Sequence, residues 1–395
     1  MNSRRLAIVT SRFWPIFGLP QMMAADLAIG FQQQGHHVEI LTTRWEHHWS
    51  KSFSFRSVPV TRLPAASNGP WGNYRSHRVL SRQLMSGKFD GVLLFGLEDG
   101  LEAIVATLGK TKTKIVLRLD DSVGHQALWA KNLSKKTLAA LRAIDGIVCT
   151  TPVLQQRLLA VGVQNENLSV IPDGTPQRAG HQRTQNQQSL ARMALSDAHP
   201  VFAIERDQPL VVTGVPLNGD AGIFDLVHAW KKVVRQMPKA RLWIMGDGPQ
   251  GKKLWSQITS ENLVYSAIMP GFIDCLDDLF DAADLYAHPA RDEVGQAYLT
   301  RALASGVCPV TTDDLNGRIR DGVSGKVVPK QDPERMASTI IELIENSSLR
   351  NELGYAAKMS VASDMLIEAT NATYLSLLSD QPCTTNPIST CEPIS

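Results

Sequence analysis

The stretch that decides the fold spans residues 271–329 and reads GFIDCLDDLFDAADLYAHPARDEVGQAYLTRALASGVCPVTTDDLNGRIRDGVSGKVVP. In it, and just before it, short apolar segments alternate with segments of helical character. The predicted strands lie at 265–272, 284–290 and 307–312, and the predicted helices at 275–283 and 296–305. Strands of this length separated by helices of about ten residues are typical of βαβ units and predict a parallel sheet. Because ligands bind outside the carboxyl ends of such strands, we expect a site in residues 291–297.

The same alternation recurs along the chain and divides it into two halves. In the first half, the strand RLAIVT at 5–10 is followed by a loop, a helix at 21–34 and a strand at 37–43. The second half begins again with the strand LVVTG at 210–214, and a helix follows at 223–235. With 395 residues, the chain is too long for a single ordinary core and suits two domains.

Composition argues against several classes of protein. Lys and Arg number 40 against 38 Asp and Glu, so no overall positive charge points to nucleic acid. The five cysteines have no C-x-x-C spacing, and His47 and His48 lack a Cys or acidic partner at ligand spacing. Neither a disulfide framework nor a metal site is therefore predicted. The chain shows no signal-peptide core and no apolar run of about 18 residues, so we expect a cytoplasmic protein.

The second half contains motifs that resemble those of a known family. After the strand at 284–290 the chain has Pro-Ala, Glu-Val-Gly-Gln and a helix that ends Ala-Ser-Gly-Val-Cys-Pro-Val, and an earlier turn has Gly-Asp-Gly-Pro. These motifs occupy residues 289–290, 293–296, 304–310 and 246–249. In spacing and residue type they resemble the donor-binding half of the family-four retaining glycosyltransferases, and the likeness extends over most of residues 4–378.

This resemblance implies an α/β protein of the GT-B fold. Two Rossmann-like domains with parallel sheets would face each other across a cleft, and a C-terminal helix would cross back to the first domain. The expected segments are an N-terminal domain at 1–175, a linker and exposed segment at 176–208, a C-terminal domain at 209–366, the returning helix at 367–378 and a disordered tail at 379–395. The Gln-, Arg-, Ser- and Pro-rich composition after residue 175 is typical of a linker.

The resemblance also implies the reaction and its partners. A nucleotide-sugar donor would bind to the second domain, and a glycan, a lipid-linked molecule or a small molecule would be the acceptor on the first. The family retains the configuration of the sugar and needs neither a metal nor another cofactor, and we expect none here. No nucleic-acid partner is expected.

Site residues follow by matching the chain to the family pattern. The candidate catalytic residues are Asp120, next to the reacting carbon or the acceptor hydroxyl, and Glu293, which would hold sugar hydroxyls. The candidate donor-binding residues, which would lie beside the phosphates, the sugar or the ribose, are Gly18, Gly214, Gly295, Gln296, Ala297, Arg301, Arg291 and Arg318. Other roles are open for three of these residues. Gly18 also suits a plain turn, Asp120 suits a helix cap, and Glu293 suits a charge at a helix N-terminus.

The chain departs from the family pattern in four places, one of which is the loop at 313–317, shorter than the family's Gly-Gly-x-x-Glu and without its Glu. The family has an Arg and a Lys after the first strand of the second domain, where this chain has Val215 and Ala221. The second acidic residue of the donor motif is replaced by Arg301, whose guanidinium only donates hydrogen bonds. In one interpretation the site is rebuilt, because arginines match phosphate bidentately. In the other, the chain is an inactive binding or scaffold protein, and arginines 291, 301, 318 and 320 pair with aspartates 292, 313, 314 and 321.

Two further segments give expectations for structure and for partners. We expect residues 45–71 to be irregular and residues 348–378 to form one helix. In the predicted helix at 71–88, Arg75, Arg78 and Arg82 share one face. This face suits either a solvated surface or peripheral contact with anionic lipid at the inner membrane face.

Overall fold

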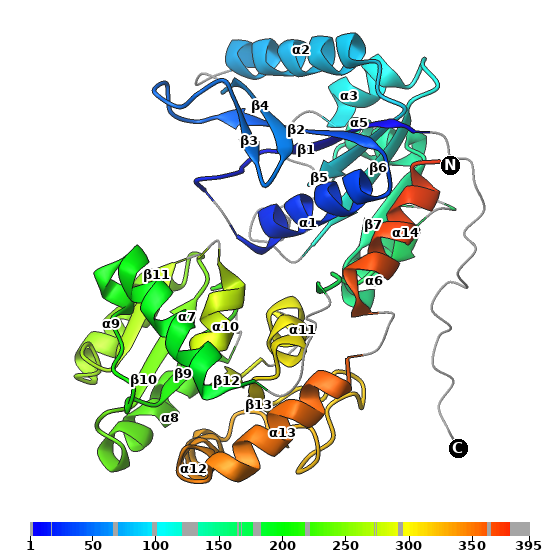
Figure 1. Cartoon of the computed structure of the whole chain (residues 1–395). Coiled ribbons are helices and arrows are strands. Elements are labelled where there is room, and N and C mark those ends of the chain that lie inside the picture. Colours follow the sequence, from blue (N-terminus) through cyan, green and yellow to red (C-terminus); the bar gives the residue numbers. More distant parts are fainter. Residues whose placement is uncertain are drawn as a thin grey trace, which may run out of the picture. The chain divides into compact units, whose positions relative to one another are not determined.

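The chain forms two compact α/β units (Figure 1). The computed structural model describes residues 3–379 except 17, 66–69, 97–100, 121–132, 164–165, 167, 177–182, 218–221, 272, 274, 291–294 and 362–364, together with the backbone alone for 70–75. Unit 1 comprises Met1–Gly174 and Asp364–Ser395, and unit 2 comprises Thr175–Ser363. The expected disordered tail lies almost wholly outside the described residues.

Unit 1 is built on an eight-stranded sheet with the order β3-β4-β2-β1-β5-β6-β7-β8. Every neighbouring pair is parallel except β3 and β4. The strands are β1 Arg5–Thr10, β2 His37–Arg44, β3 Ser52–Phe55, β4 Val58–Pro64, β5 Gly91–Phe95, β6 Lys114–Leu119, β7 Gly146–Cys149 and β8 Leu168–Val170. The helices are α1 Leu19–Gln33, α2 Pro70–Gly87, α3 Leu101–Leu108, α5 Lys135–Ala143, α6 Pro152–Ala160 and α14 Ile367–Leu377.

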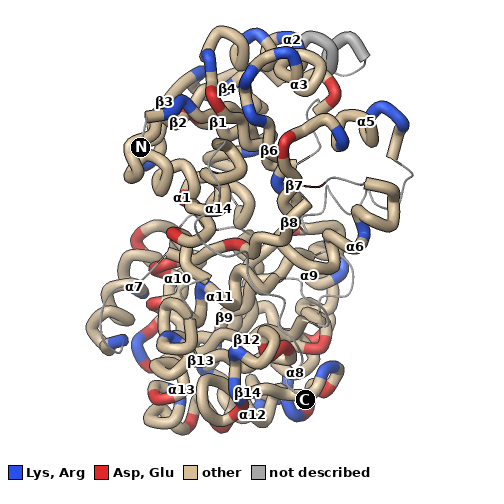
Figure 2. The backbone as a smooth tube through the Cα atoms, turned by 90° about the vertical axis from the view of Figure 1, so that its right-hand side faces the viewer, with Lys and Arg blue, Asp and Glu red and all other residues tan. Residues whose placement is uncertain are grey.

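The prediction that residues 45–71 are irregular was wrong, because they contain the antiparallel hairpin of β3 and β4. Arg56 and Ser57 form its two-residue turn, and both have positive φ, 48° and 73°. Positive φ at both central residues of the turn matches the right-handed twist of a hairpin. The residues usually found in such turns are Asn-Gly or Asp-Gly, and this chain has neither pair here. The hairpin extends the edge of the sheet, and Lys and Arg lie near it and along α2 (Figure 2).

Unit 2 contains a six-stranded parallel sheet with the order β11-β10-β9-β12-β13-β14. The strands are β9 Leu210–Gly214, β10 Arg241–Met245, β11 Ala267–Gly271, β12 Leu285–His288, β13 Cys308–Thr311 and β14 Lys326–Val327. The helices are α7 Gln185–Ala198, the 3₁₀ turn η1 Pro200–Phe202, α8 Ile223–Gln236, α9 Gly251–Ser260, α10 Leu276–Ala282, α11 Gln296–Ser305, α12 Pro333–Glu345 and α13 Ser347–Met359. The strand order reverses between β9 and β12, so this is the switch point where parallel sheets bind ligands.

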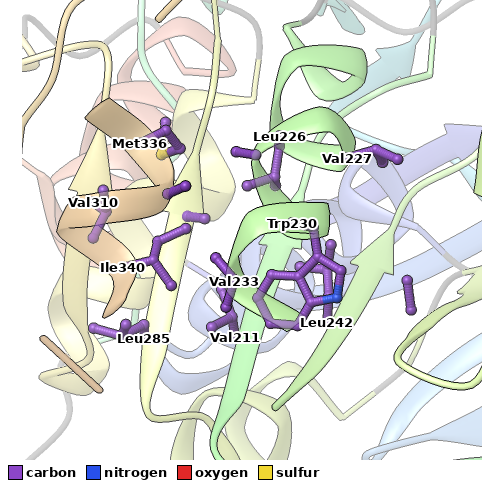
Figure 3. Close-up of a cluster of buried hydrophobic side chains, with 14 of the residues drawn as sticks. Val211, Leu226, Val227, Trp230, Val233, Leu242, Leu285, Val310, Met336 and Ile340 are labelled. Carbon is purple, nitrogen blue, oxygen red and sulfur yellow. The ribbon is translucent and has the colours of Figure 1, made fainter. Parts of the chain in front are cut away.

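The core of unit 2 lies between its sheet and the helices α8 and α12. Apolar residues of α8 recur at helical spacing, at Ile223, Leu226, Val227, Trp230 and Val233, and all are buried. Trp230 is fully buried against the sheet (Figure 3). Its indole Nε1 donates to Ser266 Oγ at 3.3 Å. This packing against the sheet fixes the direction of α8. The N-terminus of α8 lies at the carboxyl edge of the sheet.

The expectation of a linker at 176–208 was wrong for much of that segment. Helix α7 begins at a capping box. The backbone N–H of Gln187 donates to the Thr184 side chain, and the backbone N–H of Thr184 donates to the Gln187 side chain. The helix then packs on α10, and the buried Arg192 donates to the carboxylate of Asp284 at 2.8 Å. The polar composition of α7 therefore reflects caps and buried hydrogen bonds rather than flexibility.

The C-terminal region forms two helices where one was expected. Helix α13 ends at Met359 in unit 2, and α14 begins at Ile367 in unit 1, where it lies beside α1 (Figure 1). Gly30 of α1 makes this contact close, because a Cβ there would lie 1.8 Å from Asn371 Nδ2. The expected α/β fold with a returning C-terminal helix is thus confirmed.

Candidate functional site

The carboxyl ends of β9 and β12 carry backbone that is packed too tightly for side chains. Gly214 ends β9, and a Cβ on it would lie 2.6 Å from the Tyr298 ring. Its carbonyl accepts a hydrogen bond of 3.0 Å from the buried hydroxyl of Tyr286. A glycine at this position thus lets helix α11, which carries Tyr298, sit directly on the strand end.

Helix α11 begins at this edge without a side-chain cap. Gly295 is its N-cap residue with φ 82°, and a Cβ on it would lie 3.2 Å from Gly214 O and 3.4 Å from Val215 Cγ1. The backbone N–H groups of Gln296 and Ala297 make no hydrogen bond within the described part of the chain. Uncapped N–H groups together with the helix dipole make such a helix end attractive to an anion.

Helix α8 begins at the same edge. Its N-cap, Gly222, has φ 70°, and a Cβ there would lie 1.8 Å from the carbonyl oxygen of Pro289, which follows β12. The two helix N-termini are therefore held against neighbouring strand ends by glycines, at the point where the strand order reverses. Gly222 was not among the residues predicted from the sequence, although it opens an amphipathic helix directly after a strand and a loop.

The side chain of Gln296 is already engaged. Its Nε2 donates to Asp313 Oδ2 at 2.9 Å, and the N–H of Leu315 donates to Asp313 Oδ1 at 2.8 Å. Asp313 thus ties the loop after β13 to the start of α11. Gln296 contributes backbone rather than side chain to any ligand at this helix end.

His288, the last residue of β12, is the polar side chain that sequence analysis missed. It is fully buried, and neither ring nitrogen has a hydrogen-bond partner among the described residues. Its Cε1, which lies between the two nitrogens, is 3.3 Å from the position of a Cβ on Gly295. Burial lowers the pKa of His288 to about 4, although the nearby Asp313 carboxylate opposes the shift. The ring is therefore neutral near pH 7, and its nitrogen-bearing edge faces the start of α11.

Of the arginines proposed for a rebuilt site, Arg301 and Arg318 lie in the described part of the chain. Arg301 lies on α11 and is buried, with 7% of its surface exposed, and its charge acts against the raised pKa that burial gives Tyr298. Arg318 is half-buried in the loop after β13. Both Arg301 and Arg318 interact with other residues, whereas Arg320 has an exposed side chain and its backbone N–H donates to Ser324 Oγ at 3.0 Å. Arg291 and Glu293 lie outside the described residues.

Val215 is one of the apolar residues that stand where the family pattern has a cation. It is fully buried, follows β9 and packs against the start of α11. Its backbone N–H donates to Met245 O at 3.2 Å. Ala221, the second departure, lies outside the described residues.

Gly18 and Asp120 both belong to unit 1. Gly18 is buried and is the N-cap residue of α1, so this helix start has no side-chain cap. Its φ of −160° is extended backbone that any residue adopts, so the backbone conformation does not require a glycine. Asp120 follows β6 and is buried, and its Oδ2 accepts a 2.6 Å hydrogen bond from Arg118 Nη1. The helix that Asp120 was alternatively expected to cap falls in 121–132, outside the described residues. The roles of both residues stay predictions.

Two family models match the chain. The model "Glycosyltransferase Family 4" covers residues 21–177, and "Glycosyl transferases group 1" covers residues 197–360. Together they span both units.

The chain belongs to the family-four glycosyltransferases.

As the sequence predicted, this family-four glycosyltransferase transfers a sugar from a nucleotide-sugar donor. Curated relatives include the lipopolysaccharide core biosynthesis glycosyltransferase LpsE of Rhizobium meliloti, 25% identical over 62% of this chain and 67% of its own. A GDP-mannose-dependent monoacylated phosphatidylinositol monomannoside mannosyltransferase of Corynebacterium glutamicum is 23% identical over 96% of this chain and 99% of its own. The chain matches only 21% of the poly(glycerol-phosphate) alpha-glucosyltransferase of Bacillus subtilis, at 28% identity.

Solved structures share the fold of this glycosyltransferase. Sucrose-phosphate synthase from Thermosynechococcus elongatus matches with a TM-score of 0.70 and 17% identity, over 95% of this chain and 98% of that one. Anabaena HepE, solved with UDP and glucose, matches with a TM-score of 0.69 and 16% identity, over 96% and 100%. WaaG, described as a glycosyltransferase of lipopolysaccharide biosynthesis, matches with a TM-score of 0.65 and 18% identity, over 93% and 99%.

Two features are absent from the described residues. No described helix is long and apolar enough to cross a bilayer. Within the described ranges, no group of three or more His, Cys, Asp or Glu side chains is placed to hold a metal ion.

Proposed function

We propose that unit 2 binds the nucleoside diphosphate of the donor at the uncapped start of α11, with the start of α8 beside it. The observation that carries this proposal is the close packing of Gly214, Gly222 and Gly295, which leaves backbone rather than side chains at the switch point. Bare backbone N–H groups at a helix start suit a diphosphate, and the helix dipole favours its negative charge. HepE, solved with UDP-glucose, supports a uridine nucleotide as the first donor to test.

The leaving diphosphate needs positive charge that Val215 does not supply. We infer that arginines 291, 301 and 318 take over this role together with the helix dipoles, because stabilisation of developing charge by fixed groups is the main catalytic aid expected. Glu293 would then hold sugar hydroxyls. The reaction is proposed to retain the configuration of the sugar and to need no metal, as the family resemblance implies.

Unit 1 is proposed to bind the acceptor, with Asp120 near the reacting carbon or the acceptor hydroxyl. The names of LpsE and of the mannosyltransferase point to lipopolysaccharide and phosphatidylinositol derivatives as acceptors of those proteins. They favour a glycan or a lipid-linked acceptor here, with a small molecule as the alternative. A cytoplasmic enzyme that contacts the inner membrane face peripherally fits such an acceptor.

Calorimetry and thermal melting test the donor site. The chain is titrated with UDP, GDP, ADP and dTDP and with their glucose or mannose conjugates. One nucleotide series should raise the melting temperature, since ligand at 100 times Kd adds about 2.7 kcal/mol to stability. Absence of any response across the panel contradicts the proposed donor site.

A charge reversal tests the role of the arginines. Arg301→Glu should weaken nucleotide binding at least tenfold, while Arg320→Glu, an exposed residue of the loop after β13, should leave it unchanged. Equal affinity in both variants makes Arg301 a bystander.

The buried, apolar Val215 favours one second candidate, a donor-binding protein without turnover. Release of UDP from a UDP-sugar in the presence of an acceptor separates the two functions, because only a transferase breaks the bond between the sugar and the diphosphate. Nucleotide-sugar binding without any release of nucleotide, with cell-envelope lipid extracts offered as acceptor, would favour the scaffold.

A further inference from the structure

Charge is distributed very unevenly along this chain. Residues 44–88 contain eight Lys or Arg and one Asp or Glu, which leaves 32 basic against 37 acidic residues elsewhere. This segment runs from the end of β2 through the β3–β4 hairpin to the residue after α2. One edge of unit 1 is therefore strongly basic in a protein whose remainder is acidic (Figure 2).

The cations of this edge are not neutralised by neighbouring carboxylates. Within the described residues, no ion pair involves Arg44, Lys51, Arg78, Arg82 or, on the loop after β1, Arg12. Some lysines outside this edge, namely 114, 231, 232, 239 and 326, do pair with acids. Unpaired surface cations produce a positive field that attracts an anionic partner.

A rigid aromatic cluster holds the loops of this edge together. The buried guanidinium of Arg62 lies over the Phe53 ring at 4.1 Å and over the Trp49 ring at 5.1 Å. Its Nη2 donates to Trp14 O at 2.7 Å, and its Nη1 donates to Ser50 O at 3.0 Å. The loops after β1 and β2 are thus fastened to the hairpin, so side chains that project from them keep their positions.

Several large apolar side chains project from these fastened loops. Trp14 is 42% exposed, Ile16 38% and Trp45 46%. The indole Nε1 of Trp45 donates to Ser11 O at 2.9 Å, which brings Trp45 to the same loop as the other two. Trp45 also lines a cavity of about 60 Å³ with His77 and Leu80 of α2, so the loop surface and α2 adjoin.

We propose that this surface docks onto a bilayer that contains anionic lipid. We call it the basic–aromatic face and define it by Arg12, Trp14, Ile16, Arg44, Trp45, Lys51, Arg56, Arg78 and Arg82. Tryptophan favours the boundary between headgroups and acyl chains, and each Lys or Arg near an anionic leaflet adds to the attraction.

A bilayer fits this face better than other polyanions do. Ile16 neither stacks on a sugar or base nor forms a hydrogen bond, so an exposed aliphatic side chain gains nothing from a glycan or nucleic acid. It does gain from the apolar part of a bilayer. The proposal places membrane contact on the loops and hairpin as well as on α2, where the sequence pattern alone indicated only the arginines.

Vesicle binding tests the proposal without any sugar transfer, so its outcome is independent of the donor site. The full chain should bind vesicles of phosphatidylcholine mixed with phosphatidylglycerol, should bind pure phosphatidylcholine far less, and should be released by salt. Binding to both vesicle types alike, or to neither, overturns the proposal.

Two matched pairs of variants locate the contact. Lys51→Glu with Arg56→Glu should weaken binding to anionic vesicles roughly 30-fold, whereas Lys110→Glu with Lys112→Glu, also exposed on unit 1, should change it little. Trp45→Ala should weaken binding, whereas Trp255→Ala, in unit 2 and 47% exposed, should not. Melting curves confirm that each variant folds.

A competition experiment distinguishes a bilayer from other polyanions such as heparin or DNA. Heparin or DNA should displace Trp45→Ala from vesicles more readily than wild type, because the variant has lost part of its apolar contact with the bilayer. Equal vesicle binding by Trp45→Ala and wild type, with full displacement by heparin, would identify a general polyanion surface and contradict membrane docking.

Discussion

Arg118 and Asp173 are joined by two hydrogen bonds of 2.7 Å, from one guanidinium nitrogen of Arg118 to both carboxylate oxygens of Asp173. The second guanidinium nitrogen donates to Asp120, the candidate catalytic carboxylate. Burial disfavours the charged guanidinium, but the carboxylates of Asp173 and Asp120 outweigh it and raise the pKa of Arg118. One buried cation therefore positions Asp120 and also anchors the last residues of unit 1 before the chain enters unit 2.

Removal of this cation should destabilise unit 1 strongly. Arg118→Met leaves two buried carboxylates without their partner, and loss of one member of a buried ion pair costs about 3–5 kcal/mol. Lys114→Met is the control, because its pair with Asp145 is about one-third exposed and is worth at most about 1 kcal/mol. Urea unfolding curves measure both. Equal losses would mean that Arg118 contributes no more than a surface charge.

Gly174, next to the ion pair in sequence, should also be sensitive to substitution. A Cβ there would lie 2.4 Å from Thr370 Oγ1 and 2.7 Å from Ile367 Cα, so Gly174→Ala should push α14 away from unit 1 at a cost of about 1–3 kcal/mol. Hydrogen exchange in α14 should then rise. Gly146→Ala, whose Cβ would meet Val116 at an ordinary 3.6 Å, should leave exchange in α14 unchanged. Unchanged exchange in both variants would show that α14 tolerates the added methyl group.

Gly295 should matter for donor binding as well as for stability. Gly295→Ala and Gly306→Ala both place a side chain in left-handed backbone, at φ 82° and 75°, and each should lose about 1–3 kcal/mol of stability. Only Gly295→Ala crowds Gly214 O and the start of α11, whereas Gly306 has its nearest neighbour at 3.7 Å. Calorimetry with the nucleotide that binds wild type should therefore show weaker binding for Gly295→Ala alone. Equal affinities would place the diphosphate elsewhere.

The sequence predicted the strands and helices of the parallel sheets well, because apolar runs and helical periodicity are local. It missed the β3–β4 hairpin, whose Arg56–Ser57 turn lacks the usual residues, and helix α7, whose polar face is buried through Arg192. The hairpin gives no usual turn signal, and for α7 the local capping-box residues Thr184 and Gln187 were outweighed by the polar composition of the segment.

The sequence predicted glycines of the candidate site but not the ion pair of Arg118 or the buried His288. Glycines such as Gly214 and Gly295 were found through their motif, and the structure gives the steric reason for each. The ion pair of Arg118 with Asp173 joins residues 55 positions apart, and only folding brings them together. The solitary His288 had no partner in sequence to draw attention to it.

His288 should make stability depend on pH in a specific window. Burial holds its pKa at about 4 in the folded chain, whereas an unfolded histidine titrates near 6.5. Between these values the unfolded state binds more protons, so this contribution to stability is complete above about pH 6.5 and is lost as the pH falls toward 4. The shift corresponds to roughly 3 kcal/mol at most.

His288→Asn, which does not titrate, should therefore flatten the pH dependence of unfolding between pH 4 and 6.5. His37→Asn, at an exposed position of β2, should keep the wild-type slope. The measurement is urea unfolding at several pH values. The same slope in wild type and in His288→Asn would mean that the buried ring takes up its proton without cost, which a fully enclosed imidazole without hydrogen-bond partners should not do.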